Sequence, residues 1–144
     1  GGFTMMMGEM LTLKQLNLPV KIFVFNNEEL SFIAMEMKAS GYLDYATDFV
    51  NPDFGKLAEA AGIKGVSITN SSEVDEKIME ALNHNGPVIV NVRVDKQELA
   101  MPPKIAYQQA KGFSKYLINA ILDGRGTELK EMAKTNWMKY KSLY

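Results

Sequence analysis

The sequence contains no cysteine, and this absence excludes a disulfide framework, thiolate catalysis and a zinc site built on thiolates. It has a single histidine, His84, in an Asn-His-Asn-Gly turn with no acidic partner close in sequence, which we interpret as a solvated loop residue. No apolar run approaches the ~20 residues that a membrane-spanning helix requires. The net charge of -1 argues against a general nucleic-acid-binding protein, so we expect no nucleic acid as a partner.

The chain also lacks an initiator methionine and the basic residues that open a secretion signal. The missing methionine leads us to expect part of a longer protein, and the missing basic residues lead us to expect no signal peptide. The missing cysteines are compatible with a cytosolic location. What is present is a chain of 144 residues with 47% apolar side chains, which is enough for the core of one domain.

Helical and strand-like patterns alternate along residues 1–95. Apolar residues recur at helical spacing in residues 3–16, 28–38, 53–61 and 72–82, and strand-like patterns cover residues 20–25, 63–69 and 88–94. This order predicts an α/β fold, part of a doubly wound parallel sheet with helices on both faces. Residues 96–144 predict an irregular connector with Pro102-Pro103 extended, followed by a C-terminal helical extension. Because three strands are few for such a domain, we expect preceding polypeptide to supply more.

Several local details follow from the same patterns. The methionine-rich residues 3–16 are expected to be largely buried as a crossover helix, with the methionines filling core space rather than binding metal. Residues 20–25 should be covered on both faces. Ser71 or Ser72 should cap the next helix, and Ser72 with Asp75 resembles a capping box. The expected inward faces of the later helices include Ile33, Ile121 and Trp137, with Thr127 capping the last helix.

Two short polar sequences flank the first helix and strand, Gly1-Gly2 at one end and Asn26-Asn27 at the other. If a strand precedes Gly1, parallel pairing brings both sequences to the same edge of the sheet. Glycine lets backbone N–H groups approach an anion, and asparagine offers a neutral oxygen to a hard cation such as Mg2+. Either sequence alone is typical of an ordinary turn. Their spacing across one crossover favours a metal–diphosphate site.

The same spacing resembles the motif of thiamine diphosphate enzymes, which runs Gly-Asp-Gly, about two dozen residues, then Asn-Asn. Gly1 would be the second glycine, and the aspartate would precede the chain. Further segments make nearly the whole chain similar to the quinone-linked bacterial pyruvate oxidases: Leu18-Pro19-Val20-Lys21, Phe32-Ile33-Ala34-Met35-Glu36-Met37-Lys38, Gly86-Pro87-Val88 and Ala133-Lys134-Thr135-Asn136-Trp137.

This resemblance implies an enzyme that oxidatively decarboxylates pyruvate to acetate and CO2. Its cofactors would be thiamine diphosphate, Mg2+ and FAD, with FAD bound mainly by a domain outside this chain and electrons passing to a membrane quinone. It also implies a homo-oligomer, a tetramer in the family, in the cytoplasm and peripherally associated with the inner face of the cell membrane. The electron acceptor, quinone or oxygen, is left open by the sequence.

The resemblance also assigns site residues. Gly1 and Gly2 match the amides that bind the diphosphate, Asn27 matches the side-chain Mg2+ ligand, and Glu29 matches the position that gives a main-chain carbonyl to the metal. Phe32 aligns with an aromatic near the thiazolium and flavin, and Glu36 with an active-site carboxylate. Core packing for Phe32 and a solvated charge for Glu36 remain alternatives. Without the motif's aspartate, we expect this chain alone to be inactive and to bind thiamine diphosphate weakly.

The C-terminal residues 124–144 carry one arginine and four lysines against two glutamates, together with Trp137. A basic amphipathic helix with a tryptophan is typical of an anionic lipid surface, and docking on its own protein is the alternative. The resemblance favours the membrane. Two other classes stay open for the whole chain: another thiamine diphosphate enzyme such as acetolactate synthase, and a non-enzymatic nucleotide-binding or interaction module.

Overall fold

The computed structural model describes residues 1–96 and 107–142, with side chains to residue 138. It contains two compact units: unit 1 comprises Gly1–Glu28 and Phe49–Val94, and unit 2 comprises Glu29–Asp48 and Asp95–Tyr144. The expected extended Pro102-Pro103 lies outside the described residues. The functional boundary at residue 95 stays a prediction, and the compact units divide the chain differently because a helix from the first half groups with the C-terminal helices.

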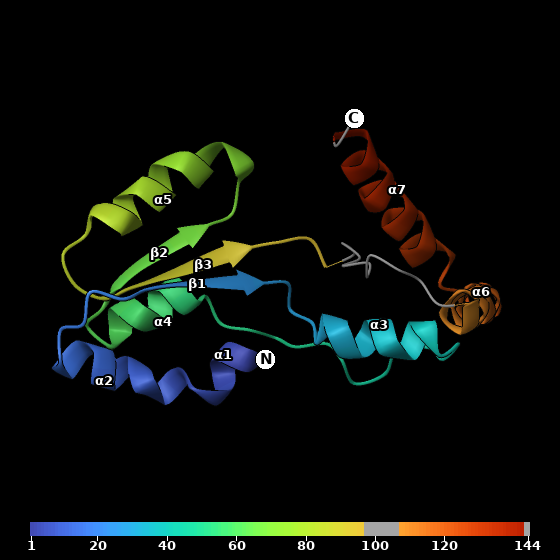
Figure 1. Cartoon of the computed structure of the whole chain (residues 1–144), viewed down its shortest axis with the longest axis horizontal. Helices are drawn as coiled ribbons and strands as arrows, with labels where there is room; N and C mark the ends of the chain where they lie inside the picture. Colours follow the sequence, from blue (N-terminus) through green and yellow to red (C-terminus); the bar gives the residue numbers. More distant parts are fainter. Residues whose placement is uncertain (97–106, 143–144) are drawn as a thin grey trace. The chain divides into compact units, whose positions relative to one another are not determined.

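Unit 1 is built on a parallel sheet of three strands, β1 (Lys21–Asn26), β2 (Lys64–Ile68) and β3 (Val88–Arg93). The strand order is β1-β3-β2, so β3 is central, and the register places Asn26 opposite Arg93 (Figure 1). The apolar run of β3 is buried on both faces, as its sequence predicts. The α/β class with a parallel sheet is therefore confirmed.

Helices cover both faces of this sheet (Figure 1). On one face α1 (Gly2–Met5), α2 (Met10–Gln15) and α4 (Phe54–Ala60) pack around Ile89. On the other face α5 (Val74–Asn83) packs through Ala81 against Val88 and Val90. The alternation of side chains along each strand thus divides the core of unit 1 into two layers.

The beginning of the chain differs from its prediction. The single helix expected over residues 3–16 is divided into α1, a 3-10 turn η1 (Met7–Glu9) and α2, and Met10 is its buried apolar residue. Phe25 of β1 is 70% exposed, so the strand is not covered on both faces. The reason is that β1 pairs with β3 alone among the described strands, which leaves its outer edge and neighbouring apolar surface uncovered.

The helices of unit 1 begin and end at distinct signals. Asp53 caps α4 by accepting hydrogen bonds from the N–H groups of Gly55 and Lys56, and α4 ends before Gly62, whose φ is 74°. The capping box expected at Ser72 is wrong. Instead a 3-10 turn, η2 (Ser71–Glu73), leads into α5 without a side-chain cap.

Unit 2 consists of α3 (Ser31–Ala39), α6 (Tyr107–Leu122) and α7 (Gly126–Ser142). A Cβ on Gly112 of α6 would lie 1.9 Å from the Ala39 carbonyl oxygen, so glycine permits the close contact between α6 and α3. The core contains Tyr116, Ala120 and Met132. Among the described residues no helix is both long and apolar enough to cross a membrane.

The predicted inward faces of α6 and α7 are confirmed at Leu117 and Met132, but some of the residues expected to face inward are exposed. Ile33, Ile121 and Trp137 are exposed, and α7 begins at Gly126, which places Thr127 inside the helix rather than at its cap. Lys38 is the unexpected buried residue of α3, paired with Asp44 at 3.8 Å and Glu128 at 3.4 Å. Its long apolar stem is buried with it, and Nζ lies 5.5 Å from the centroid of the Tyr116 ring.

Candidate functional site

The end of β1 is anchored by a buried amide, Asn26, which is 3% exposed. Asn26 Nδ2 donates to Asn91 Oδ1 on β3 at 3.1 Å, and Asn26 Oδ1 accepts from Asn51 Nδ2 at 2.9 Å. The same oxygen accepts from the Glu28 N–H at 3.3 Å. Because a buried amide is costly unless it is hydrogen-bonded, these contacts fix where the strand stops and the next turn begins.

The turn that follows has an unusual backbone. Glu28 has a φ of 56°, a left-handed conformation that costs a residue with a Cβ about 1–3 kcal/mol unless its surroundings hold it. Its carbonyl accepts from the Phe49 N–H at 2.8 Å, and both carboxylate oxygens accept from Arg93 at 2.6 and 2.7 Å. Asn27 lies between these two anchored residues and is half-buried.

Glu29 belongs to unit 2 and pairs with Asp48 in an antiparallel bridge. The neighbouring Leu30 N–H donates to the Thr47 carbonyl at 2.8 Å. Glu29 and Asp48 therefore form a non-hydrogen-bonded antiparallel pair, in which the main-chain N–H and C=O of Glu29 point away from the facing segment. Burial raises the pKa of its side chain, while Lys38 and Lys96 partly oppose that rise. Glu28 and Glu29 both precede α3, which begins at Ser31.

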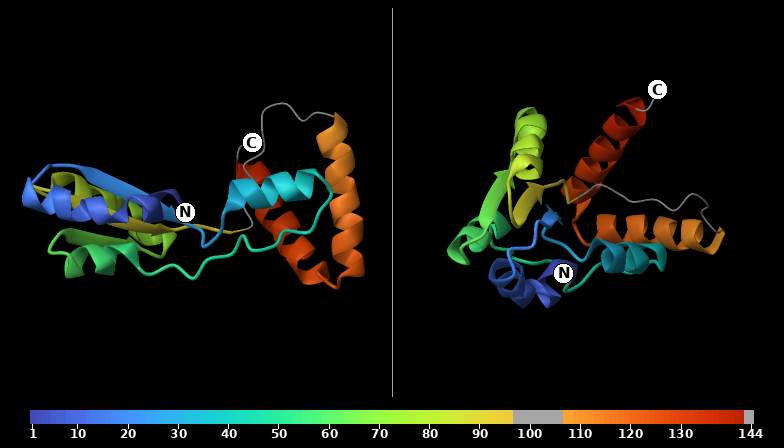
Figure 2. Two further views of the ribbon diagram at one scale, coloured as in Figure 1. Left: turned by 90° about the horizontal axis from the view of Figure 1, so that it is seen from below. Right: turned by 60° about the vertical axis from the view of Figure 1, so that its left-hand side comes forward.

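Gly1 and Gly2 open α1 at the carboxyl end of the sheet. Phe3 packs edge-on against Phe54 at the start of α4, with ring centroids 5.1 Å apart, and Asp53 beside it accepts from Ser67 Oγ of β2. Figures 1 and 2 show the amino terminus at the same end of the sheet as the end of β1. A Cβ on Gly2 would meet nothing within 4 Å, so packing within this chain does not explain the glycine.

Phe32 and Glu36 both lie on α3, one turn apart, and both are exposed. Phe32 is 72% exposed, so the alternative that it packs in a core does not hold within this chain. Glu36 is exposed, which agrees with a solvated charge and with a carboxylate that contacts a ligand. The structure describes these two residues with unit 2, whereas Gly1, Gly2 and Asn27 belong to unit 1.

The turn after β1 contains a group that suits a hard cation. Asn27 carries a neutral amide oxygen, and Mg2+ commonly completes its octahedron with phosphate oxygens and water. Within residues 1–96 and 107–142, no three His, Cys, Asp or Glu side chains cluster to hold a metal ion by themselves. The donor chemistry and the open space beside Gly2 therefore fit a metal bound together with a diphosphate.

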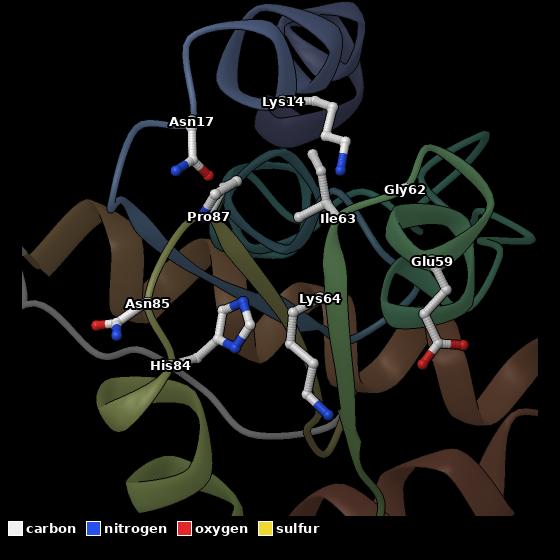
Figure 3. Close-up of a pocket in the computed structure, with 9 residues that line it drawn as sticks. All are labelled: Lys14, Asn17, Glu59, Gly62, Ile63, Lys64, His84, Asn85 and Pro87. Carbon is white, nitrogen blue, oxygen red and sulfur yellow. The ribbon is translucent and has the colours of Figure 1, made fainter.

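A cavity of about 490 Å³ lies at the opposite end of the sheet (Figure 3). Figure 3 shows lining residues from the ends of α2 and α4, from the turn after α5 and from the start of β2. They include Lys14, Lys64 and the exposed His84. Because α2, α4 and α5 end there, the helix dipoles disfavour an anion, and the basic residues offset the terminal carbonyls. The polarity of the helices at this cavity is therefore opposite to that at the carboxyl end of the sheet.

Sequence reasoning missed the network around Asn27, namely Asn26 as an anchor, Asn51, Asn91 and Arg93. One signal was available, because Asn91 interrupts the apolar run of β3 and a polar residue inside a buried strand requires a partner. The identity of that partner, 65 residues away, was not available.

Comparison with known proteins identifies the family to which the sequence is similar. A family profile described as "Thiamine pyrophosphate enzyme, C-terminal TPP binding domain" matches residues 1–92. This range contains β1, β2, β3 up to Val92 and the turn at residues 26–28. It also contains all six predicted site residues: Gly1, Gly2, Asn27, Glu29, Phe32 and Glu36.

Individual relatives are similar over most of the chain. Bacillus subtilis YdaP, whose name describes a thiamine pyrophosphate-containing protein, is 36% identical over 94% of this chain and 23% of its own length. The catalytic subunit of mitochondrial acetolactate synthase from Saccharomyces cerevisiae is 38% identical over 69% of the chain and 15% of that protein. Escherichia coli acetolactate synthase isozyme 2 large subunit is 33% identical over 71% and 19%. The chain thus spans less than a quarter of each of these relatives.

Proposed function

The chain belongs to the thiamine pyrophosphate enzymes as a C-terminal TPP-binding domain, and from this premise we propose that it holds a magnesium ion and the diphosphate of the cofactor at the carboxyl edge of its sheet. Asn27 supplies a side-chain oxygen to the metal, and Glu29 supplies its main-chain carbonyl. The N–H groups of Gly1 and Gly2 bind the diphosphate. The observation that carries this proposal is the anchored turn that presents Asn27.

The chemistry of the reaction belongs to the cofactor, which when bound supplies an electron sink for the decarboxylation of a 2-keto acid. This chain's contribution is binding and orientation. The buried amides fix the end of β1, the left-handed turn fixes Asn27, and the space beside Gly2 admits the anion.

The proposal is tested by Asn27→Ala in the full-length protein. Calorimetric titration of Mg2+ in the presence of thiamine diphosphate should show a Kd for Mg2+ raised by more than about tenfold, because even indirect partners of a metal ligand contribute that much. Asn85→Ala, an exposed amide at the other end of the sheet, is the matched control and should leave the Kd unchanged. Unchanged binding in Asn27→Ala would support a nucleotide-binding or interaction module that needs only the glycines.

For the complete reaction we propose the oxidative decarboxylation of pyruvate to acetate and CO2, with FAD and a membrane quinone as electron carriers. The overall resemblance, which extends into residues 133–137, supports this reaction. The second candidate is acetolactate synthesis, which the names of the yeast and Escherichia coli relatives favour. Assaying the full-length protein for acetate and for acetolactate from pyruvate separates the two.

Phe32 and Glu36 are proposed to contact the reacting part of the cofactor or substrate. Their exposure on one side of α3 supports this role, because neither side chain is buried within unit 2. Phe32→Ala and Glu36→Gln should lower kcat while leaving the Kd for Mg2+ unchanged. A parallel loss of Mg2+ affinity would assign them to positioning the metal loop instead.

The C-terminal segment is proposed to associate with anionic lipid at the inner face of the cell membrane, in a homo-oligomeric protein. Trp137 and Met138 support this, since both are more than half exposed on α7. Deleting the segment would remove Met132 from the core of unit 2, so Trp137→Ser with Met138→Ser is the sharper change. Reduced pelleting with anionic liposomes is expected, and Ile118→Ser on α6 is the control. Equal pelleting would remove the membrane role.

A further inference from the structure

The ion pair between Glu28 and Arg93 joins the turn after β1 to the end of β3. Both guanidinium terminal nitrogens take part, donating to the two carboxylate oxygens at 2.6 and 2.7 Å. Arg93 is the last residue of β3 and lies in register opposite Asn26. The pair therefore ties Glu28 to the neighbouring strand beside the buried amides, 65 residues away along the chain.

The geometry of the pair matters because of the backbone that it holds. Glu28 adopts a left-handed φ of 56°, which a residue with a Cβ rarely adopts without outside restraint. A parallel, two-point contact fixes direction as well as distance, which a single charged contact does not. With Asn26 anchored on one side and Glu28 on the other, the segment between them has little freedom to rotate.

We propose that Arg93 and Glu28 are a positioning pair that sets the orientation of Asn27 toward the bound magnesium ion. This inference rests on the proposed function, since it assumes that Asn27 is a ligand. Neither Arg93 nor Glu28 touches the metal. Their effect passes through the turn, in the way that partners of metal ligands fix ligand orientation.

A purely structural role predicts something different. Arg93 and Glu28 side chains are 51% and 31% exposed, and exposed ion pairs contribute little to the stability of a fold. Breaking the pair is therefore expected to change the stability of the fold little. A change in the orientation of a metal ligand is expected to lower the affinity for the metal more strongly. The two roles separate when stability and metal affinity are measured on the same variants.

The test uses Glu28→Gln, Arg93→Met and the double variant in the full-length protein. Calorimetry gives the Kd for Mg2+ at saturating thiamine diphosphate, and thermal unfolding without ligand gives stability. Each single variant should raise the Kd about three- to tenfold, and the double variant no more than the larger single effect. Arg93→Lys restores the charge without the two-point contact and should recover affinity in part.

A matched control is the Lys64–Glu80 pair, which joins β2 to α5 at 2.6 Å and is comparably exposed. Glu80→Gln should leave the Kd for Mg2+ unchanged. Unchanged affinity in both Glu28→Gln and Arg93→Met, with Asn27→Ala still losing binding, would overturn the positioning role and leave the proposed function intact. Equal losses in Glu80→Gln would also overturn it. Unchanged binding in Asn27→Ala would overturn both proposals.

Discussion

The two ends of the sheet in unit 1 are made from the same strands, yet they differ in helix polarity. At the carboxyl end α4 and α5 begin, and Asp53 accepts from backbone N–H groups there. At the amino end α2, α4 and α5 terminate, and Lys21 Nζ donates to the His84 and Gly86 carbonyls at 2.8 and 2.6 Å. Helix dipoles thus favour an anion at the carboxyl end of the sheet and cations at the amino end.

The two ends also differ in how their polar groups are held. At the carboxyl end the amides of Asn26 and Asn91 are buried and bonded to each other. At the amino end His84 and Asn85 are exposed. Burial makes a polar group costly to lose, because its partner is left without a bond in a dry environment. Equivalent substitutions at the two ends should therefore have unequal effects.

Asn26→Ala should produce the largest difference between the ends. It removes three hydrogen bonds, including the one from Asn51, and leaves Asn91 Oδ1 buried without its donor. The free energy of unfolding should fall by about 2–3 kcal/mol. Urea denaturation measures this change.

The matched substitution at the amino end is Asn85→Ala, which should change the free energy of unfolding by less than about 0.5 kcal/mol because the side chain is exposed. Similar losses in Asn26→Ala and Asn85→Ala would contradict the distinction between a buried and a solvated end.

Local signals were enough to predict the main features of the fold. The three strands and the helix over residues 53–61, which ends before Gly62, follow from the apolar pattern of neighbouring residues. The broken first helix and the exposed Phe25 did not follow, because a pattern of apolar residues shows what can be buried, not what is present to bury it.

The candidate site was predictable only where its residues belong to a local motif. Asn27 and Glu29 came from a motif, whereas the residues that hold the turn are far apart in sequence. Glu28 pairs with Arg93 and Asn26 with Asn91, each 65 residues apart, and one sequence contains no record of such pairs. The left-handed φ of Glu28 was equally hidden, since glutamate has no preference for it.

A smaller effect is expected from Asp53→Asn at the carboxyl end. Burial opposes ionisation of Asp53, but hydrogen bonds from Ser67 Oγ and from the Lys56 and Gly55 N–H groups outweigh it and lower its pKa. A lowered pKa stabilises the fold above the unfolded-state value and is lost as the pH falls through the folded-state value. Asp53→Asn should therefore cost about 1 kcal/mol at pH 7 and nothing at a pH well below 3.8.

Glu59 sits in the last turn of the same helix and provides the comparison. Glu59→Gln removes an acidic group from a helix carboxyl terminus and should leave stability at pH 7 unchanged or slightly higher. Chemical denaturation between about pH 2.5 and pH 7 measures the free energy of unfolding of both variants. If Asp53→Asn kept the wild-type pH dependence, the hydrogen-bonded carboxylate would not be its source.

The smallest effect on stability should come from Gly2→Ala, which also tests the ligand side of the comparison. A Cβ at Gly2 meets nothing within 4 Å, so the free energy of unfolding should change by less than about 0.5 kcal/mol. Affinity for the magnesium-bound diphosphate should nevertheless fall, because the added methyl group enters the space through which the anion reaches the backbone N–H groups. Gly8→Ala in η1 is the control, since its Cβ is equally unhindered and should leave affinity unchanged. Equal affinities for the two alanine variants, measured by calorimetry, would show that the open space beside Gly2 is not used by the ligand.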